Sequence, residues 1–205
     1  MTEAAVSGRR ANKRGVRSRE SMLEAAIASL ATGDPAAVSG NRIARDIGAT
    51  WSVVKYQFGD IDGLWAAVLR YTADKRGDLP AGIKPNGTLR ERVSAMITAM
   101  AVGLRKPESL AIETLRAALP REHAELERDY PLTAAELASW KPNWDIACAR
   151  AFADLELDPV KVRQVAALIP AAMRGITSER TLGTYGNLDD ALDALIGGIV
   201  AYLEA

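Results

Sequence analysis

Hydrophobic side chains recur at spacings of three and four residues along most of the chain. The first such stretch begins at about Arg17, and its apolar positions are Met22, Leu23, Ala26, Ile27 and Leu30. This spacing places the apolar side chains on one face of a helix. Later stretches repeat it to the last residues, and none alternates between apolar and polar residues as a strand would. The pattern predicts an all-α protein of about nine helices.

Turn-forming residues divide this pattern into separate helices. Gly33-Asp34-Pro35 ends the first helix. Two short helices are expected next, one from Ser39 to Ile47 and one from Thr50 to about Phe58. Ser39 and Thr50 are expected to cap them, because a hydroxyl just before a helix can accept a hydrogen bond from a free backbone amide.

The clearest linker is LPAGIKPNG, residues 79–87, which holds two prolines and two glycines. We therefore expect a flexible basic arm over 1–16, a first helical domain over 17–79 and a second over 80–205. The arm has no apolar periodicity. The first 20 residues carry six cations against two carboxylates, so this end of the chain suits an anionic partner.

Composition excludes several classes of protein. Lys+Arg and Asp+Glu are both 26, and Cys148 and His123 are the single cysteine and histidine of the chain. An internal disulfide and a metal site built on paired imidazoles are therefore excluded. No apolar run approaches the roughly 20 residues that span a bilayer, and no signal-peptide core is present. We expect a cytoplasmic protein with no cofactor, no metal and no membrane contact. The lack of a Ser/His/Asp set or a phosphate-binding glycine loop argues against an enzyme.

The segment SGNRIARDIGATWSVVKYQF, residues 39–58, has the spacing of a helix-turn-helix. Counted from Gly40, Ala44 is fifth, Gly48 is ninth and Val54 is fifteenth. The two helices can approach closely only at a small residue, and the tight turn needs a glycine that can adopt positive φ. An ordinary helical hairpin uses the same packing and remains the alternative.

Residues from about Arg17 to Leu69 resemble the DNA-binding domain of the TetR family of bacterial transcriptional regulators. The matching features are MLEAAIASL, Gly33, the segment 39–58, Gly59-Asp60 and the helix at Leu64. The resemblance implies a homodimer that binds a palindromic operator in double-stranded DNA. It also implies a C-terminal ligand-binding domain, usually that of a repressor released from DNA by a small effector.

Three positions depart from the family's pattern. Lys55 stands where the family commonly has tyrosine, and the aromatic residue comes one position later, at Tyr56. Ile61 stands where a lysine is common, and Trp51 stands where the residue is usually small or polar. Two of these departures fall on the expected DNA-facing surface, so the operator sequence cannot be inferred from the family.

The second helix of the motif is expected to bury Val53, Val54 and Phe58 and to point its other residues outward. Lys55 can then contact a guanine edge or a phosphate, and Tyr56 a phosphate or a thymine methyl. The candidate DNA-binding residues lie in the basic arm, at the start of the first helical domain and on both motif helices: Arg14, Arg17, Ser39, Asn41, Arg42, Thr50, Trp51, Ser52, Lys55 and Tyr56.

Alternatives remain for three of these residues. Tyr56 can instead pack against the next helix, and the indole of Trp51 can cover the first motif helix. Arg42 can be an ordinary solvated charge.

Large, soft and aromatic side chains gather on the helices of the second domain, where they either line a ligand pocket or form plain core. They are Met96, Met100, Trp140, Trp144, Cys148, Phe152 and Met173. Pro142 and Pro170 fall inside helical stretches of this domain, and each is expected to kink or interrupt its helix.

The last two helices carry long apolar stripes, which indicate a four-helix interface between two copies of the chain. The candidate interface residues are Val165, Ile169, Ile176, Leu192, Leu195, Ile196, Ile199 and Leu203. Packing inside the subunit is the alternative.

The sequence therefore favours a dimeric, sequence-specific DNA-binding regulator, a repressor released by a small apolar or aromatic effector. The alternative function is that of a helical small-molecule-binding protein whose DNA binding is lost or non-specific.

Overall fold

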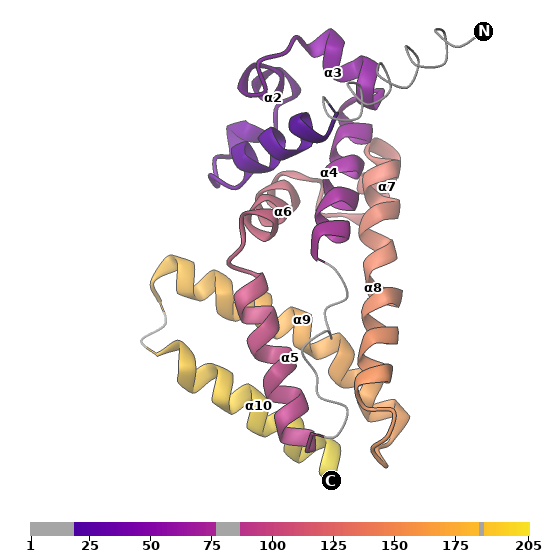
Figure 1. Ribbon diagram of the computed structural model, residues 1–205, viewed down its shortest axis with the longest axis vertical. Coiled ribbons are helices and arrows are strands. Elements are labelled where there is room, and N and C mark those ends of the chain that lie inside the picture. The colour runs from indigo at the N-terminus through magenta and orange to yellow at the C-terminus, as the bar shows by residue number, and fades with distance from the viewer. Residues whose placement is uncertain (1–18, 77–86, 185–186) are drawn as a thin grey trace, which may run out of the picture. The chain divides into compact units, whose positions relative to one another are not determined.

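The computed structural model describes residues 19–76, 87–184 and 187–205, and all regular structure within them is helical (Figure 1). A helix over 19–30 comes first. It is followed by η1 (Pro35–Val38), α2 (Gly40–Asp46), α3 (Trp51–Phe58), α4 (Ile61–Arg76), α5 (Leu89–Gly103), α6 (Pro107–Ala118), α7 (His123–Asp129), α8 (Pro131–Ala151), α9 (Pro159–Leu182) and α10 (Leu188–Glu204). The prediction of an all-α fold with about nine helices is confirmed.

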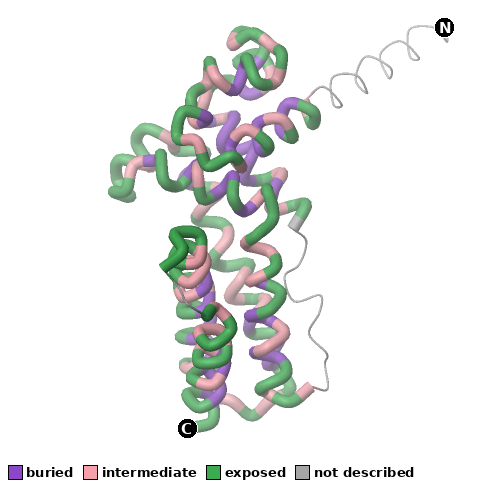
Figure 2. The backbone as a smooth tube through the Cα atoms, turned by 90° about the vertical axis from the view of Figure 1, so that its left-hand side faces the viewer, coloured by how far each residue is buried: buried purple, intermediate pink, exposed green. Residues whose placement is uncertain are grey.

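The described helices fall into two compact units. The first holds the elements up to Lys75 together with Pro107–Leu137, and the second holds residues 87–106 and Ala138–Ala205. The chain thus returns to the first unit after α5, and α6 packs there against η1. Buried residues recur between exposed ones along most of the described helices (Figure 2), as the spacing of apolar residues predicts, whereas α7 has no buried residue.

The first unit is built on the apolar faces of its helices. The predicted face of the first helix is buried, with Met22, Leu23, Ala26, Ile27 and Leu30 all at most 8% exposed. On α4, Leu64, Trp65 and Val68 are buried as well. Tyr71 of α4 donates a hydrogen bond to Glu24 of the first helix (2.9 Å), and Lys75 pairs with the same carboxylate (3.0 Å). Polar contacts therefore close the edge of an apolar interface.

A buried carboxylate joins the start of α4 to the start of α8. Asp62 accepts hydrogen bonds from the backbone amides of Leu132 and Thr133, both at 2.8 Å. These amides lie in the first turn of α8, where no residue of the helix itself can accept from them. The negative charge also suits the positive end of the helix dipole. Asp62 therefore caps a helix that begins 69 residues later, at Pro131.

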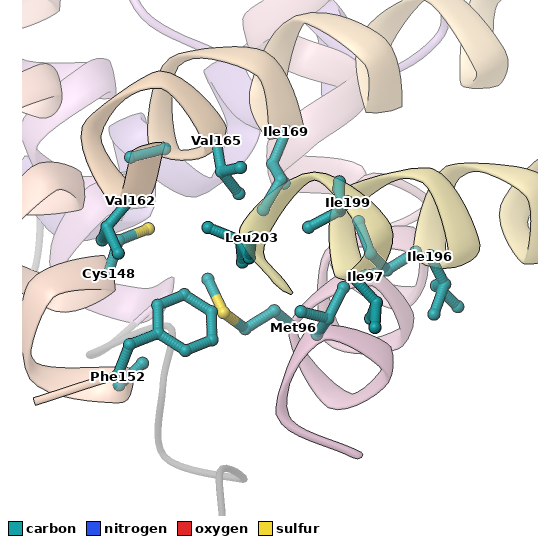
Figure 3. Packing of buried hydrophobic residues seen from close by; sticks show 14 of the residues in the cluster. Met96, Ile97, Cys148, Phe152, Val162, Val165, Ile169, Ile196, Ile199 and Leu203 are labelled. Atoms are coloured by element: carbon teal, nitrogen blue, oxygen red, sulfur yellow. The ribbon is translucent and has the colours of Figure 1, made fainter. Parts of the chain in front are cut away.

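The core of the second unit is one apolar cluster made by α5, α9, α10 and the end of α8. Figure 3 shows side chains from these helices converging, among them Met96, Phe152, Ile169 and Leu203. α5 and α10 pack against each other, and α9 packs against both.

One charged residue lies inside this apolar unit. The side chain of Arg92, on α5, is 3% exposed and is bound through both terminal nitrogens by Asp154 (2.5 and 2.6 Å). It also donates to the carbonyl oxygens of Gly87 (2.8 Å) and Ala151 (2.9 Å). The hydrogen bonds from Arg92 hold the pKa of the Asp154 carboxyl below its ordinary value. Arg92 thus ties the start of α5 to the turn that follows α8.

The two prolines expected to kink or interrupt their helices do not interrupt them. Pro142 lies inside α8 and Pro170 inside α9, and both helices continue past them. A proline cannot donate to the carbonyl four residues earlier, which for Pro170 is the carbonyl of Ala166. The indole Nε1–H of Trp144 donates to that oxygen instead, at 2.6 Å. A side chain of α8 therefore supplies the donor that α9 lacks.

We predict that Trp144→Phe lowers the free energy of unfolding by about 1–3 kcal/mol, because it leaves the Ala166 carbonyl without a donor. In a Pro170→Ala background the same substitution should cost less, since the new amide at position 170 donates to Ala166. Urea unfolding of the four variants in this cycle measures both effects. An equal cost in the two backgrounds would show that only the bulk of the indole matters.

We also predict an acid-sensitive contribution from Asp154. Its folded-state pKa is depressed, so its stabilisation is present above the unfolded pKa of about 3.9 and is lost as the pH falls through the folded value. Asp154→Asn should therefore be less stable than the wild type at pH 7, and the difference should shrink below about pH 4. The matched control is Glu156→Gln, an exposed carboxylate two residues away. A difference that stays constant with pH would contradict the prediction.

Candidate DNA-binding surface

The segment 39–58 folds as the predicted pair of helices around a tight turn. Gly48 has φ of 67°, the left-handed conformation that a glycine accepts without strain. The amide of Ala49 donates to the carbonyl of Ala44 (2.8 Å), which closes the end of α2. Ala44 and Val54 are both buried where α2 and α3 pack together. The residues expected at the fifth, ninth and fifteenth positions therefore have the predicted roles.

One of the three residues expected to hold α3 in place does not do so. Val54 and Phe58 are buried, but Val53 is 42% exposed. The expectation that Val53 faces inward is wrong because neighbouring residues on a helix point about 100° apart. Val54 and Phe58 are four residues apart and share a face, and Val53 cannot lie on that same narrow face.

The outward face of α3 carries Ser52, Lys55 and Tyr56, all exposed as expected. Tyr56 is 87% exposed, so the alternative that it packs against α4 is not realised.

Trp51 takes the alternative left open for it and covers the first helix of the motif. A Cβ atom at Gly40 would lie 2.8 Å from its ring, so the indole rests on the backbone at the start of α2. Trp51 stays partly exposed there. The absence of a side chain at Gly40 is what lets this ring approach.

Ser39 and Thr50 occupy the predicted cap positions, but their hydroxyls make no capping hydrogen bond. Both residues are exposed. Their carbonyls accept the first helical bonds, from Ile43 (2.9 Å) and Val54 (3.2 Å). The expectation of side-chain capping is therefore wrong, and the two hydroxyls face solvent at the starts of α2 and α3.

Arg42 is held by carboxylates. It pairs with Asp46 at 3.0 Å and with Asp34 at 3.6 Å. Ser29 donates to Asp46 at 2.6 Å, and this bond, together with Arg42, lowers the pKa of Asp46. Arg42 is therefore part of a network that links α2 to the first helix, and a phosphate would have to compete with two carboxylates for it.

The sequence reasoning missed one exposed cation of α2, Arg45. It lies four residues after Asn41, which is also exposed, so the two side chains are neighbours on one face of α2. The spacing of four residues between Asn41 and Arg45 was the sequence feature that could have identified Arg45 as a candidate. Arg14 and Arg17 lie outside the described residues. Arg19, near the start of the first helix, lies over the ring of Phe58, 4.7 Å from its centre.

The residues expected to contact a ligand are mostly brought together, inside the core of the second unit. Met96, Met100, Cys148, Phe152 and Met173 are all buried members of its apolar cluster. Trp144 packs against that cluster, and Trp140 is half-buried on α8. Burial raises the pKa of the Cys148 thiol to about 12, so this group stays protonated at neutral pH.

The residues expected at a dimer interface divide into two groups. Ile176, Leu192 and Leu195 are partly exposed on α9 and α10, although Leu192 and Leu195 also pack against the core of their own subunit. The other five face the core of their own subunit, which is the internal packing left open as an alternative: Val165, Ile169, Ile196, Ile199 and Leu203. The opposite faces of the two helices carry small exposed residues, namely Ala167, Ala171 and Gly175 on α9 and Ala194, Gly198 and Ala201 on α10.

Within the described residues, no three His, Cys, Asp or Glu side chains come together as metal ligands. No helix in that part of the chain is both long enough and apolar enough to cross a membrane.

The fold is shared with solved structures of transcriptional regulators, several of which are described as members of the TetR family. One, from Rhodococcus sp., is described as a putative TetR-family regulator; it has a TM-score of 0.67 and 23% identity over 91% of this chain and 99% of its own. A transcriptional regulator from Rhodococcus sp. Rha1 has a TM-score of 0.69 and 19% identity over 91% and 98%. NalD, the secondary repressor of the MexAB-OprM multidrug efflux pump in Pseudomonas aeruginosa, has a TM-score of 0.61 and 17% identity over 91% and 96%.

No protein-family profile and no curated protein sequence matches the chain. The resemblance to the TetR family is therefore confirmed at the level of the fold: the chain has the architecture of these regulators over nearly its whole length.

Proposed function

We propose that the protein is a sequence-specific DNA-binding transcriptional regulator that acts as a homodimer. The observation that carries this proposal is the geometry of α2 and α3. Buried Val54 and Phe58 hold α3 so that Ser52, Lys55 and Tyr56 point away from the unit. An exposed helix held in this way fits the major groove, where base edges can be read.

Two kinds of contact support specific binding. Lys55 can donate to guanine, and Ser52 and Tyr56 can contact bases or phosphates. The exposed hydroxyls of Ser39 and Thr50, together with Asn41 and Arg45, are placed to contact the phosphates on either side of the groove. Arg14 of the basic arm and Arg17 at the start of the first helical domain would add phosphate contacts that weaken as salt increases.

A single helix-turn-helix reads only a few base pairs, so useful specificity needs two copies on a palindromic operator. Their recognition helices would lie about 34–36 Å apart, one turn of DNA, or a multiple of that distance. We propose that the dimer forms through the outward faces of α9 and α10. Their small residues let a partner helix approach closely, and Leu168 (49% exposed) and Tyr202 (43% exposed) offer apolar surface nearby.

We further propose that the regulator is a repressor whose DNA affinity is lowered by a small apolar or aromatic effector. The support is the gathering of methionine and aromatic side chains in the second unit, since these side chains adapt readily to new contacts. Such an effector must bind the dimer arrangement that is released from DNA more tightly than the arrangement that binds DNA. Operator DNA must then weaken effector binding by the same factor by which effector weakens operator binding.

The alternative is a helical small-molecule-binding protein without specific DNA binding. The departures at Lys55 and Ile61 are its main argument. The exposed hydroxyls of Ser39 and Thr50 and the exposed cations Arg45 and Lys55 argue against it, because such groups suit contact with phosphates and bases.

We predict that the full chain selects a two-fold symmetric sequence from random duplex DNA. Lys55→Ala should then weaken binding to that sequence by roughly 1–3 kcal/mol and relax preference at one position in each half-site. Lys106→Ala, an exposed lysine of the second unit, is the matched control and should bind as the wild type does. Failure to select any sequence would favour the alternative function.

We predict that Gly198→Arg prevents dimer formation. An added Cβ at Gly198 meets no atom within 4 Å, so the subunit accepts the substitution while a partner helix would be blocked. The control is Gly103→Arg, another helical glycine with open space around its Cβ position. Light scattering after size-exclusion chromatography should give a monomer for the first variant and a dimer for the second. A dimeric Gly198→Arg variant would place the interface elsewhere.

A further inference from the structure

An apolar side chain, Val53, lies on the outward face of α3, where it does not contribute to the core of the unit. Val53 is 42% exposed and lies beside Tyr56, which is 87% exposed. The two residues are three apart on α3, so their side chains are neighbours. Neither contributes to the core of the unit, which Val54 and Phe58 supply from the other side of the helix.

The buried residues of α3 determine where Val53 points. The core face is centred between Val54 and Phe58, and successive residues turn by about 100°. Tyr56 therefore lies nearly opposite the core, with Ser52 on one side of it and Val53 on the other. Val53 therefore lies on the outward half of the helix, about 60° from Tyr56.

The surroundings of this apolar pair identify its partner. Residues 39–58 carry three cations, of which Arg42 is paired with Asp46 and Asp34, while Arg45 and Lys55 are exposed. Such a surface suits a polyanion, yet a valine can neither donate to a phosphate nor accept from a base. The apolar group that duplex DNA presents in the major groove is the 5-methyl group of thymine.

We propose that Val53 is a specificity-determining residue that selects thymine by contacting its 5-methyl group. This inference rests on the proposed function, since it needs α3 to lie in the major groove. It assigns to Val53 a role opposite to the inward packing that the sequence suggested. It also requires at least one thymine in each half-site, at the position that faces Val53.

The test uses the full chain and the duplex that it selects from random DNA. Each thymine of the half-site is replaced in turn by deoxyuridine, which pairs identically and lacks only the 5-methyl group. At one position the wild type should bind about three- to fivefold more weakly, which corresponds to the burial of one methyl group.

The variant Val53→Ala should bind the thymine duplex with the same reduced affinity. It should also bind the thymine and deoxyuridine duplexes equally at that position, because the contact is already lost. Val102→Ala is the matched control: Val102 is 58% exposed on α5, and its variant should discriminate between the two duplexes as the wild type does. Thermal unfolding checks that both variants are folded. We expect both to fold, because each valine is exposed and contributes little to the core.

The outcomes separate the inference from the proposed function. Loss of thymine discrimination in Val53→Ala alone would support the inference. Specific binding that is insensitive to every thymine replacement would overturn the inference but would not contradict the proposed function as a DNA-binding regulator. Discrimination that persists in Val53→Ala would overturn it too, and would assign the methyl contact to Tyr56 or Ser52. Failure to select any duplex would overturn both the inference and the proposed function.

Discussion

The burial of Val54 and Phe58 is the contact on which the candidate DNA-binding surface depends. α3 is eight residues long, and an isolated helix of that length is not stable in water. Its orientation must come from packing, and these two side chains provide it. That packing also sets the direction of other residues of α3: Tyr56 points outward, Ser52 and Val53 lie on either side of it, and Trp51 points toward α2. The reading surface is thus a consequence of where two apolar residues are buried.

In the second unit, too, the residues that are buried decide which faces of the helices remain available. A helix that buries one stripe in its own core cannot offer that stripe to a partner. Val165 and Ile169 on α9 and Ile196 and Ile199 on α10 are already used in this way. What remains for an assembly is the outer faces, where small residues replace large apolar ones. The long apolar stripes therefore indicated that α9 and α10 are packed. They did not indicate whether the packing partner is the core of the same subunit or a second subunit.

Polar groups inside the two units are paired over long distances in sequence. Asp62 caps α8, Arg92 holds the turn containing Asp154, and Trp144 donates to the carbonyl that Pro170 leaves without an amide. A buried polar group without a partner would cost about 1–3 kcal/mol. Each of these contacts therefore removes a penalty that a proline, a helix end or a buried charge would otherwise impose.

The sequence by itself determined what depends on neighbours along the chain. The spacing of apolar residues predicted the helices and the buried face of the first one, and the positions of Ala44, Gly48 and Val54 predicted the helix-turn-helix, because these patterns follow from the geometry of a helix and a tight turn. Only the tertiary structure decided which way Val53 points and that Trp51 rests on Gly40. It also decided that Ser39 and Thr50 do not cap their helices with their side chains. Finally, it decided which carboxylates hold Arg42 and Arg92. The physical reason is that periodicity defines the faces of a helix but not the element that covers each face, and a polar side chain takes whichever partner folding brings within reach.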